Sequence, residues 1–444
     1  VSHGVAGEAD TTYQRVAREL LRTGLSSCQS YGILDYLTTN AGRRLSGSPG
    51  ADRAVKLAVE MMLERRFQKV HAETVMVPRW VRGNTEEGAI LSGESETPVS
   101  VCALGMSVAT PEEGITAQVV EVQSLEEARS LGEKARGRIV FFNRPFDPTH
   151  LNTFEGYGGA VDQRGGGAVA AARSGGVAAL VRAVTPVLDE VPHTGWMGYE
   201  EGVPQVPGAA ISTADADILS AMLKEDPDLR VRIRLSCASF ADVPSFNVMG
   251  ELTGTEHPEE VIVLGAHLDS WDLGTGAHDD GAGCAHAIQA LHLLRKLGIA
   301  PKRTIRAVLF TNEENGSRGG PAYVADPRRR GEKHIAAIES DRGGFAPRGV
   351  AVQADSAVLA KVLRWRPLFD GLLAGEIRFG HGGSDITPLV QAGTAGFGLL
   401  VESHRYFDYQ HSEHDTIDKV HPRELEMGAI VEALLAYLIS EEGL

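Results

Sequence analysis

The sequence contains few cysteines, and no pattern would use them together. Cys28, Cys102, Cys237 and Cys284 are scattered over 444 residues without a C-x-x-C pair. This spacing argues against a thiolate metal site and against a dense disulfide framework. It allows a single disulfide bond.

Long apolar runs and an excess of positive charge are also missing. The longest apolar candidates, such as Val431 to Ile439, fall well short of the roughly 18 residues that a membrane span needs. The 43 Lys and Arg residues are outnumbered by 59 Asp and Glu residues, and the net charge is -16. Such a charge repels phosphate backbones and anionic membrane surfaces. We therefore expect no nucleic-acid partner and no membrane partner.

Several catalytic signatures are absent as well. The sequence has no G-x-S-x-G nucleophile elbow and no H-E-x-x-H motif. Gly274-Thr275-Gly276 lacks the third glycine and the helix start that a dinucleotide-binding loop needs. No internal repeat and no low-complexity tract was found. These absences argue against three classes of enzyme: a hydrolase with a nucleophile elbow, a metallopeptidase with an H-E-x-x-H helix, and a dinucleotide-dependent enzyme.

What the sequence does contain is the composition of a globular protein with more than one domain. Hydrophobic residues make up 43% and charged residues 23%, which argues against disorder. A chain of 444 residues exceeds a typical single domain, so we expect a large core and an accessory domain. The start Val1-Ser2-His3-Gly4 lacks a methionine and a basic-then-apolar leader, which favours a mature exported form. We expect a secreted or periplasmic protein, lysosomal or extracellular in a eukaryote, with the cytoplasm as the alternative.

The composition changes in the middle of the chain. From about residue 113 to residue 236 the sequence is rich in glycine and β-branched residues, with predicted strands at 117–122, 138–142 and 178–181 and a helix at 168–174. This pattern indicates a small α/β domain, 113–236, inserted into a larger one. Residues 1–112 and 237–444 then form one discontinuous catalytic domain.

The C-terminal half predicts the main fold. From Val243 onward, strands at 260–266, 304–310, 335–338 and 397–401 alternate with loops and helices, and a helix at 282–297 stops before Gly298. This alternation is typical of a mainly parallel sheet with helices on both faces. The predicted fold class is α/β: a three-layer α/β/α sandwich with a mixed, mainly parallel sheet, plus the inserted domain.

Polar residues with metal-binding chemistry follow each of these strands. In open α/β sheets, ligands bind beyond the carboxyl ends of the strands. We expect one edge of the sheet to collect the following groups: His267 and Asp269, Asp279 and Asp280, Glu313 and Glu314, Asp341, and the segment from His411 to Thr416.

Two imidazoles and several carboxylates match the ligands of zinc, and two histidines with three carboxylates suit two ions that share one bridging carboxylate. Carboxylates crowded together without a cation would raise one another's pKa values. Because adjacent residues point in different directions, only one of Glu313 and Glu314 can readily ligate, and the other is free to act as a base. Asp269, two residues after His267, is placed to accept the second ring N–H of that histidine.

The last of these polar segments, His411 to Thr416, contains further polar residues that are weaker candidates for metal ligands. Glu413, His414 and Asp415 are more typical of turn and capping groups than of ligands. Cys284 falls in the apolar stripe of the helix at 282–297 and is better explained as a small core residue.

In order and spacing, the motifs resemble the superfamily of co-catalytic zinc aminopeptidases and glutamate carboxypeptidases. The resemblance covers nearly the whole chain and rests on RLSGS (44–48), VMVPRWVRG (75–83), HLDSWD (267–272), DDGAG (279–283), NEE (312–314), ESD (339–341) and HS with DT (411–416). It implies two zinc ions per chain. The implied ligands are His267 and Asp341 for one ion, Glu314 and His411 for the other, and Asp279 as the bridge.

The resemblance also implies a reaction. Glu313 would be the general base for a water molecule between the two ions, with Asp269 in a supporting role, and the Asp279-Asp280 peptide bond would be cis. The insert would be a protease-associated domain that roofs the site. Tyr406, Tyr409 and His381 remain open as stabilisers of the oxyanion.

The expected activity is hydrolysis of short peptides, namely dipeptides with free termini, by an enzyme that forms a homodimer. Three alternatives stay open: an aminopeptidase acting on longer peptides, a glutaminyl cyclase-like acyltransferase with one zinc, and an inactive receptor-type ectodomain. Arg342-Gly343-Gly344 and Gln410 depart from the residues expected in close members of the superfamily, so the preference for particular side chains is not predicted.

Overall fold

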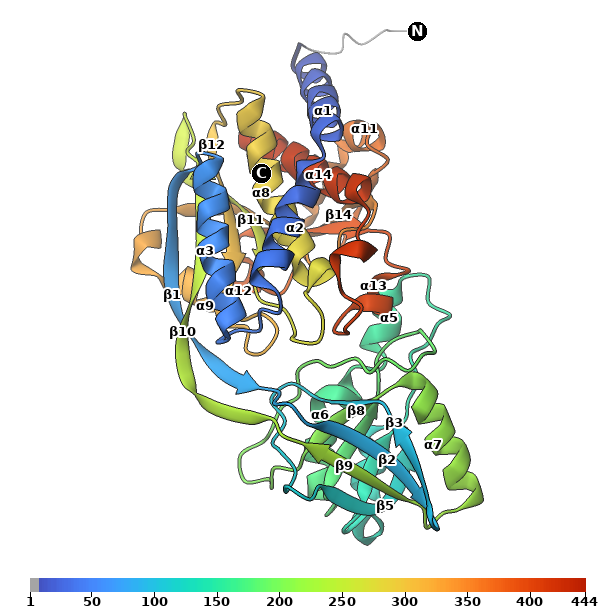
Figure 1. Ribbon diagram of the computed structural model, residues 1–444. Coiled ribbons are helices and arrows are strands. Elements are labelled where there is room, and N and C mark those ends of the chain that lie inside the picture. The colour runs from blue at the N-terminus through green and yellow to red at the C-terminus, as the bar shows by residue number, and fades with distance from the viewer. Residues whose placement is uncertain (1–7) are drawn as a thin grey trace.

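The computed structural model describes residues 8–444 and consists of two units, each built on an eight-stranded sheet (Figure 1). The first four residues, on which the expectation of a mature exported form depends, lie outside the described part. The first sheet has the strand order β1 (Gln68–Val81), β10 (Ala238–Leu252), β12 (Arg303–Phe310), β11 (His257–His267), β13 (Lys333–Glu339), β16 (Ala395–Val401), β14 (Pro347–Gln353) and β15 (Glu376–Phe379).

The centre of the first sheet is parallel and its sides are antiparallel. Strands β12, β11, β13 and β16 run parallel to one another, whereas β1 with β10, β10 with β12, and β14 with β16 pair antiparallel. In this register His267 lies beside Phe310, and Gly265 lies beside Glu339. The carboxyl ends of the central strands therefore meet at one edge of the sheet.

Helices cover both faces of the first sheet. The larger layer packs on alternate apolar strand residues such as Ile262 and Leu264 and contains α1 (Glu8–Ser27), α2 (Gln29–Ala41), α3 (Pro49–Glu64), α8 (Ala282–Lys296), α10 (Ser356–Leu363), α11 (Arg366–Asp370) and α14 (Pro422–Glu442). The other face carries α9 (Gly319–Ala325) and α12 (Thr387–Gln391), which pack on Val261 and Val263. This two-residue alternation places a core on each side of the sheet.

The second unit has its own sheet and its own helices. Its strand order is β3 (Ser95–Val99), β2 (Glu86–Ser92), β9 (Arg230–Leu235), β5 (Ile115–Val122), β6 (Ile139–Phe142), β7 (Ala178–Arg182), β8 (Gly208–Ile211) and β4 (Val101–Ala103). Its helices are α4 (Leu125–Ser130), α5 (Thr153–Gly158), α6 (Asp162–Arg173) and α7 (Thr213–Glu225). Strands β1 and β10 extend from the first sheet as a two-stranded ribbon that leads to this unit (Figure 1).

The second sheet begins earlier in the chain than the sequence suggested. Strands β2, β3 and β4 precede residue 113, yet they belong to this sheet, because β2 pairs with β9 and β4 pairs with β8. These pairings join residues more than 100 positions apart, so no local pattern reveals them. The predicted boundary at 113 therefore leaves out three strands of the sheet.

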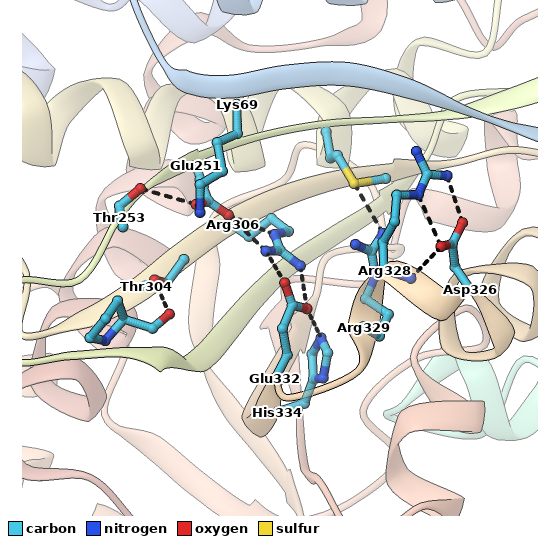
Figure 2. Close-up of polar contacts among 12 residues, drawn as sticks. Lys69, Glu251, Thr253, Thr304, Arg306, Asp326, Arg328, Arg329, Glu332 and His334 are labelled. Atoms are coloured by element: carbon cyan, nitrogen blue, oxygen red, sulfur yellow. Dashed lines mark hydrogen bonds and ion pairs between the residues drawn. The ribbon is translucent and has the colours of Figure 1, made fainter.

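A network of charged side chains centred on buried Arg306 and Glu251 connects the antiparallel side of the first sheet to the loop before β13 (Figure 2). Arg306 on β12 donates to Glu251 on β10 at 2.8 and 2.9 Å and to Glu332 at 2.7 and 2.8 Å. Lys69 on β1 reaches the other oxygen of Glu251 at 2.6 Å. Buried charges need such partners, because an unpaired one is costly to desolvate.

Two further expectations concern the whole chain. The four cysteines are free, and three of them are buried, so the single disulfide that the sequence left open is not formed. Among residues 8–444, no helix combines the length and the apolar character that crossing a membrane requires.

Candidate metal centre

The five predicted metal ligands lie together at the carboxyl edge of the first sheet. His267 is the last residue of β11, Glu314 follows β12, and Asp341 follows β13. Asp279 comes from the short turn of residues 277–281 that precedes α8, and His411 follows α13 (Tyr406–Tyr409). The parallel strands bring the first three together, and the two loops close around them.

Asp279 stands at the centre of this group. One of its carboxylate oxygens lies 3.1 Å from Nε2 of His267, and the other lies 3.1 Å from Nε2 of His411. His267 Nε2 is also 3.5 Å from an oxygen of Asp341, and His411 Nε2 is 3.2 Å from an oxygen of Glu314. Each histidine therefore shares Asp279 with the other and has a carboxylate of its own.

These separations agree with shared coordination of cations. Two atoms that each lie about 2.0–2.1 Å from one tetrahedral zinc ion are about 3.3 Å apart. Ligand atoms of His267, Asp279 and Glu314 lie within 4.8 Å of one another, as do those of His267, Asp280 and Asp341. Asp280 is the odd member, because its oxygens already accept the backbone N–H groups of His267 (3.1 Å) and Gly283 (2.9 Å).

The charge balance of the site also calls for cations. Burial, reinforced by neighbouring Asp279, raises the pKa of Glu314 to about 7. Burial likewise raises the pKa of Asp341 above its ordinary value, although His267 opposes the rise. A cation between these carboxylates would remove the penalty of holding several negative charges in a buried space.

The rings of both histidines are turned by backbone carbonyl groups. His267 Nδ1 lies 3.0 Å from the carbonyl oxygen of Asp269, and His411 Nδ1 lies 3.3 Å from that of Thr194. A proton on Nδ1 satisfies each carbonyl and leaves the lone pair of Nε2 directed at Asp279. Both imidazoles thus present the nitrogen that a metal ion requires.

The role expected for the Asp269 side chain needs correction. Its carboxylate lies 4.0 Å from His267 Nδ1, and the backbone carbonyl of the same residue makes the contact instead. The carboxylate accepts the N–H groups of Glu313 (3.1 Å) and Glu314 (3.4 Å) and the hydroxyl of Ser46 (3.0 Å). Asp269 therefore shapes the backbone that presents the two glutamates.

Asp415 holds the other side of the site without ligating. Its two oxygens accept the backbone N–H groups of His278 (2.6 Å) and Asp279 (3.0 Å). The peptide bond between Asp279 and Asp280 is cis, as the resemblance implied. Asp415 was predicted to be a turn or capping group, and its hydrogen bonds to two backbone N–H groups agree with that prediction.

A cavity of about 660 Å³ opens beside these residues, between the two units. Glu313 lines it together with the predicted ligands Asp279, Glu314, Asp341 and His411. Of the three candidate stabilisers of an oxyanion, Tyr406 and His381 line this cavity, whereas Tyr409 is stacked on His278 with ring centres 5.5 Å apart. Aromatic rings from both units form much of the remaining wall: Phe154, Tyr157, Trp196 and Phe407.

Two arginines line the cavity wall. Arg342 was noted in the sequence only as a departure from the superfamily, and Arg164 was not predicted. Arg164 on α6 has only 7% of its surface exposed and donates to the hydroxyl of Tyr157 at 2.7 Å. Its guanidinium donates to the Thr194 carbonyl oxygen at 3.5 Å and lies 3.4 Å from His411 Nδ1. Among the described residues, its Nε has no hydrogen-bond partner and no carboxylate forms an ion pair with it. Arg342 lies over the ring of Phe154, 4.9 Å from its centre. No local pattern predicts that Arg164 lies in the cavity, because it belongs to the second unit and is far in sequence from the predicted metal ligands.

Comparison with known proteins agrees with this site. Residues 247–436, which include all five predicted ligands, match the model of peptidase family M28. Carboxypeptidase Q of Bos taurus is 34% identical over 97% of this chain and 89% of its own length, and that of Homo sapiens is 35% identical over 94% and 86%. The crystal structure of a peptidase M28 precursor from Shewanella amazonensis has a TM-score of 0.94 with 35% identity and covers 98% of both chains.

A zinc aminopeptidase from Bacillus subtilis shares the fold at 18% identity, with a TM-score of 0.66 over 94% of this chain and 96% of its own. The similarity to carboxypeptidase Q, 34–35% identity over nearly the full chain, agrees with the geometry of the five predicted ligands. Together they identify this chain as a metallopeptidase that belongs to peptidase family M28.

Proposed function

We propose that this protein is a two-zinc exopeptidase that hydrolyses dipeptides with free termini. The observation that carries the two-metal part is Asp279, whose two oxygens each lie 3.1 Å from a different histidine. His267 and Asp341 would hold one ion with Asp279, and His411 and Glu314 would hold the other. When bound, the two ions would polarise the scissile carbonyl group and lower the pKa of the attacking water.

Glu313 is the residue that this proposal assigns to proton transfer. Its side chain lines the cavity and makes no hydrogen bond or ion pair with another described residue, while its backbone N–H is held by Asp269 at 3.1 Å. A carboxylate that is fixed at the backbone and free at its tip can take a proton from water and deliver it to the leaving amine. Glu314 is occupied with His411 and is unsuited to this task.

Arg164 supports the preference for a free carboxylate. A buried guanidinium without a counter-ion is unfavourable, and a substrate carboxylate would supply the missing charge. Arg164 faces the same cavity as the ligand groups and lies 3.4 Å from His411 Nδ1. The carboxylate of a dipeptide, one residue beyond the scissile bond, would therefore be held close to the metal position.

The second unit would act as the roof of the site. It contributes Tyr157, Arg164 and Trp196 to the cavity wall, and a cavity of about 660 Å³ falls in the range of about 300–1,000 Å³ that suits small ligands. We therefore assign this unit to the protease-associated domain that the resemblance implied. Its placement limits the length of substrate that the cavity accepts.

The test compares hydrolysis of a free and an amidated dipeptide by the wild-type enzyme and by cavity variants. The wild-type enzyme should cleave a dipeptide much faster than the same dipeptide with an amidated C-terminus. Arg164→Gln should lower kcat/KM for the free dipeptide about 10- to 100-fold, because a charge-assisted hydrogen bond contributes about 1.5–3 kcal/mol, and should leave the amide almost unaffected. Zinc content measured on each variant excludes loss of metal as the cause.

Arg342→Gln is the matched control, because Arg342 lines the same cavity without contacting a ligand histidine. If amidation has no effect on the wild-type enzyme, the dipeptidase proposal is wrong and an aminopeptidase on longer peptides is favoured. If Arg342→Gln abolishes the preference instead, the carboxylate is bound by Arg342. All five ligand positions carry residues that can bind a metal ion, which argues against a cyclase with one zinc ion and against an inactive receptor-type ectodomain.

A further inference from the structure

Arg82 lies at the junction of the two units, directly after β1, and is buried with 7% of its surface exposed. Its guanidinium donates to the carboxylate of Asp272 at 2.6 and 2.9 Å and to that of Glu86 at 2.9 Å. It also donates to the carbonyl oxygen of Ala103 at 2.6 Å and to the hydroxyl of Thr194 at 3.2 Å. One side chain therefore binds the loop after β11 in the first unit and three segments of the second.

The contact with Thr194 leads to one metal ligand. The N–H of Thr194 donates to the carbonyl oxygen of His411 at 2.9 Å, and the carbonyl oxygen of Thr194 lies 3.3 Å from His411 Nδ1. Thr194 thus holds both the backbone and the ring of His411. Its hydroxyl is held in turn by Arg82 and by the carbonyl of Ala103 at 2.9 Å.

The contact with Asp272 leads to a second ligand. The preceding residue, Trp271, donates its backbone N–H to Glu314 at 3.2 Å, and its ring meets the ring of His411 edge-on at 5.9 Å. The Trp271 ring is wedged against Gly105 of the second unit, where a Cβ atom would come within 1.7 Å of it. The position of Trp271 therefore depends on how the two units are joined.

The other pair of ligands does not depend on the junction in this way. His267 is the last residue of β11, and Asp341 follows β13, so both are carried by neighbouring parallel strands of the first sheet. No described contact of His267 or Asp341 involves the second unit. The two halves of the metal centre are thus supported by different parts of the fold.

We propose that Arg82 is a positioning residue for the metal position formed by His411 and Glu314, and that it couples the second unit to this position alone. The inference rests on the proposed two-metal function. It assigns to the second unit a task beyond covering the cavity, since the unit would complete one of the two metal positions. Lysine would not replace Arg82, because a single ammonium group cannot bind Asp272, Glu86 and Thr194 in one plane.

The experiment measures zinc binding by equilibrium dialysis for the wild type, Arg82→Gln, Arg82→Lys and a control, Arg306→Gln. Loss of a residue that orients a metal ligand typically lowers metal affinity about 10- to 100-fold. Arg82→Gln should keep one tightly bound zinc and weaken the second by that factor, with Arg82→Lys between it and the wild type. Arg306→Gln also removes a buried arginine with two carboxylate partners, but should keep both affinities.

Hydrogen exchange in the metal-free proteins gives a readout that needs no bound zinc. Peptides covering residues 190–198 and 405–415 should exchange faster in Arg82→Gln than in the wild type and should be unchanged in Arg306→Gln. If the wild type binds fewer than two zinc ions, the two-metal function is wrong and the exchange data alone decide the role of Arg82.

Two results would overturn the inference. The first is wild-type zinc affinity and wild-type exchange in Arg82→Gln. The second is a loss of affinity for both zinc ions that is equally large in Arg82→Gln and Arg306→Gln. Removing either buried arginine would then weaken zinc binding only by lowering the stability of the protein. If Arg82→Gln does not fold, Arg82→Lys and Thr194→Val, which removes only the hydroxyl contact, are held to the same two criteria.

Discussion

Glu313 and Glu314 offer the sharpest test of the proposed chemistry, because they are neighbours with different tasks. The Glu313 side chain has no partner among the described residues, so Glu313→Gln breaks no hydrogen bond and preserves the shape of the cavity. Burial, together with Asp341 and Glu314, raises the pKa of Glu313 well above its ordinary value despite nearby His267. Replacing it by a neutral amide therefore relieves repulsion and should not lower the thermal stability of the metal-free protein.

The expected loss of activity follows from the missing base. Removing a positioned general base costs about 10²- to 10⁴-fold in rate, or about 2.7–5.4 kcal/mol of activation free energy. We expect kcat for a dipeptide to fall by at least this range in Glu313→Gln, with zinc content unchanged. The assay is steady-state hydrolysis alongside zinc analysis of the same preparation.

Glu314→Gln is the matched control. Glu314 lies 3.2 Å from His411 Nε2 and accepts the Trp271 N–H at 3.2 Å, so the amide keeps the second contact and weakens the first. Zinc should be lost first, and activity should return in part at high zinc concentration. Near wild-type kcat in Glu313→Gln, with its zinc bound, would refute the assignment of Glu313 as the base.

Three other predictions concern metal binding and stability. His411→Ala should reduce bound zinc toward one ion per chain, whereas His414→Ala should not; the reverse result would move the ligand to His414. Arg306→Met should lower the free energy of unfolding by about 3 kcal/mol, because it removes the arginine partner of buried Glu251 and of partly buried Glu332, although Lys69 still contacts Glu251; a change in the urea midpoint no larger than that of an exposed arginine variant would contradict this. Glu432 on α14 has both carboxylate oxygens buried without hydrogen-bond partners among residues 8–444, and burial raises its pKa well above the ordinary value. The folded state therefore holds this proton more tightly than the unfolded state, so the group's contribution to stability declines as pH rises above about 4.3. Glu432→Leu should stabilise the protein more at about pH 8 than at about pH 5 in urea unfolding, and an equal effect at both pH values would count against the reasoning.

Much of the main sheet could be predicted from the sequence, as could the polar groups that follow its strands; the choice of five proposed ligands among those groups came from the resemblance to the superfamily. Strands 260–266 and 304–310 are short apolar runs with polar residues at their ends, and parallel strands in register bring those ends together. The helix predicted at 282–297 is observed as α8, and Gly298 follows its end with a positive φ of 69°. These features depend on neighbours in the chain, which is why local patterns carry them. Helix α2 was not predicted, since its start at Cys28 has no side-chain cap.

Only the tertiary structure decided the surroundings of the ligands. It moved the contact with His267 from the carboxylate of Asp269 to its carbonyl, a choice made by the turn of the chain after β11. It also placed Arg164 and Thr194 of the second unit beside His411, and gave strands β2 to β4 to the second sheet. The last two cases have the same physical reason. The sequence determines which residues end a strand and can bind a metal, but these contacts join segments more than 100 residues apart. They arise because two separate cores pack against each other, and no short sequence pattern predicts that packing.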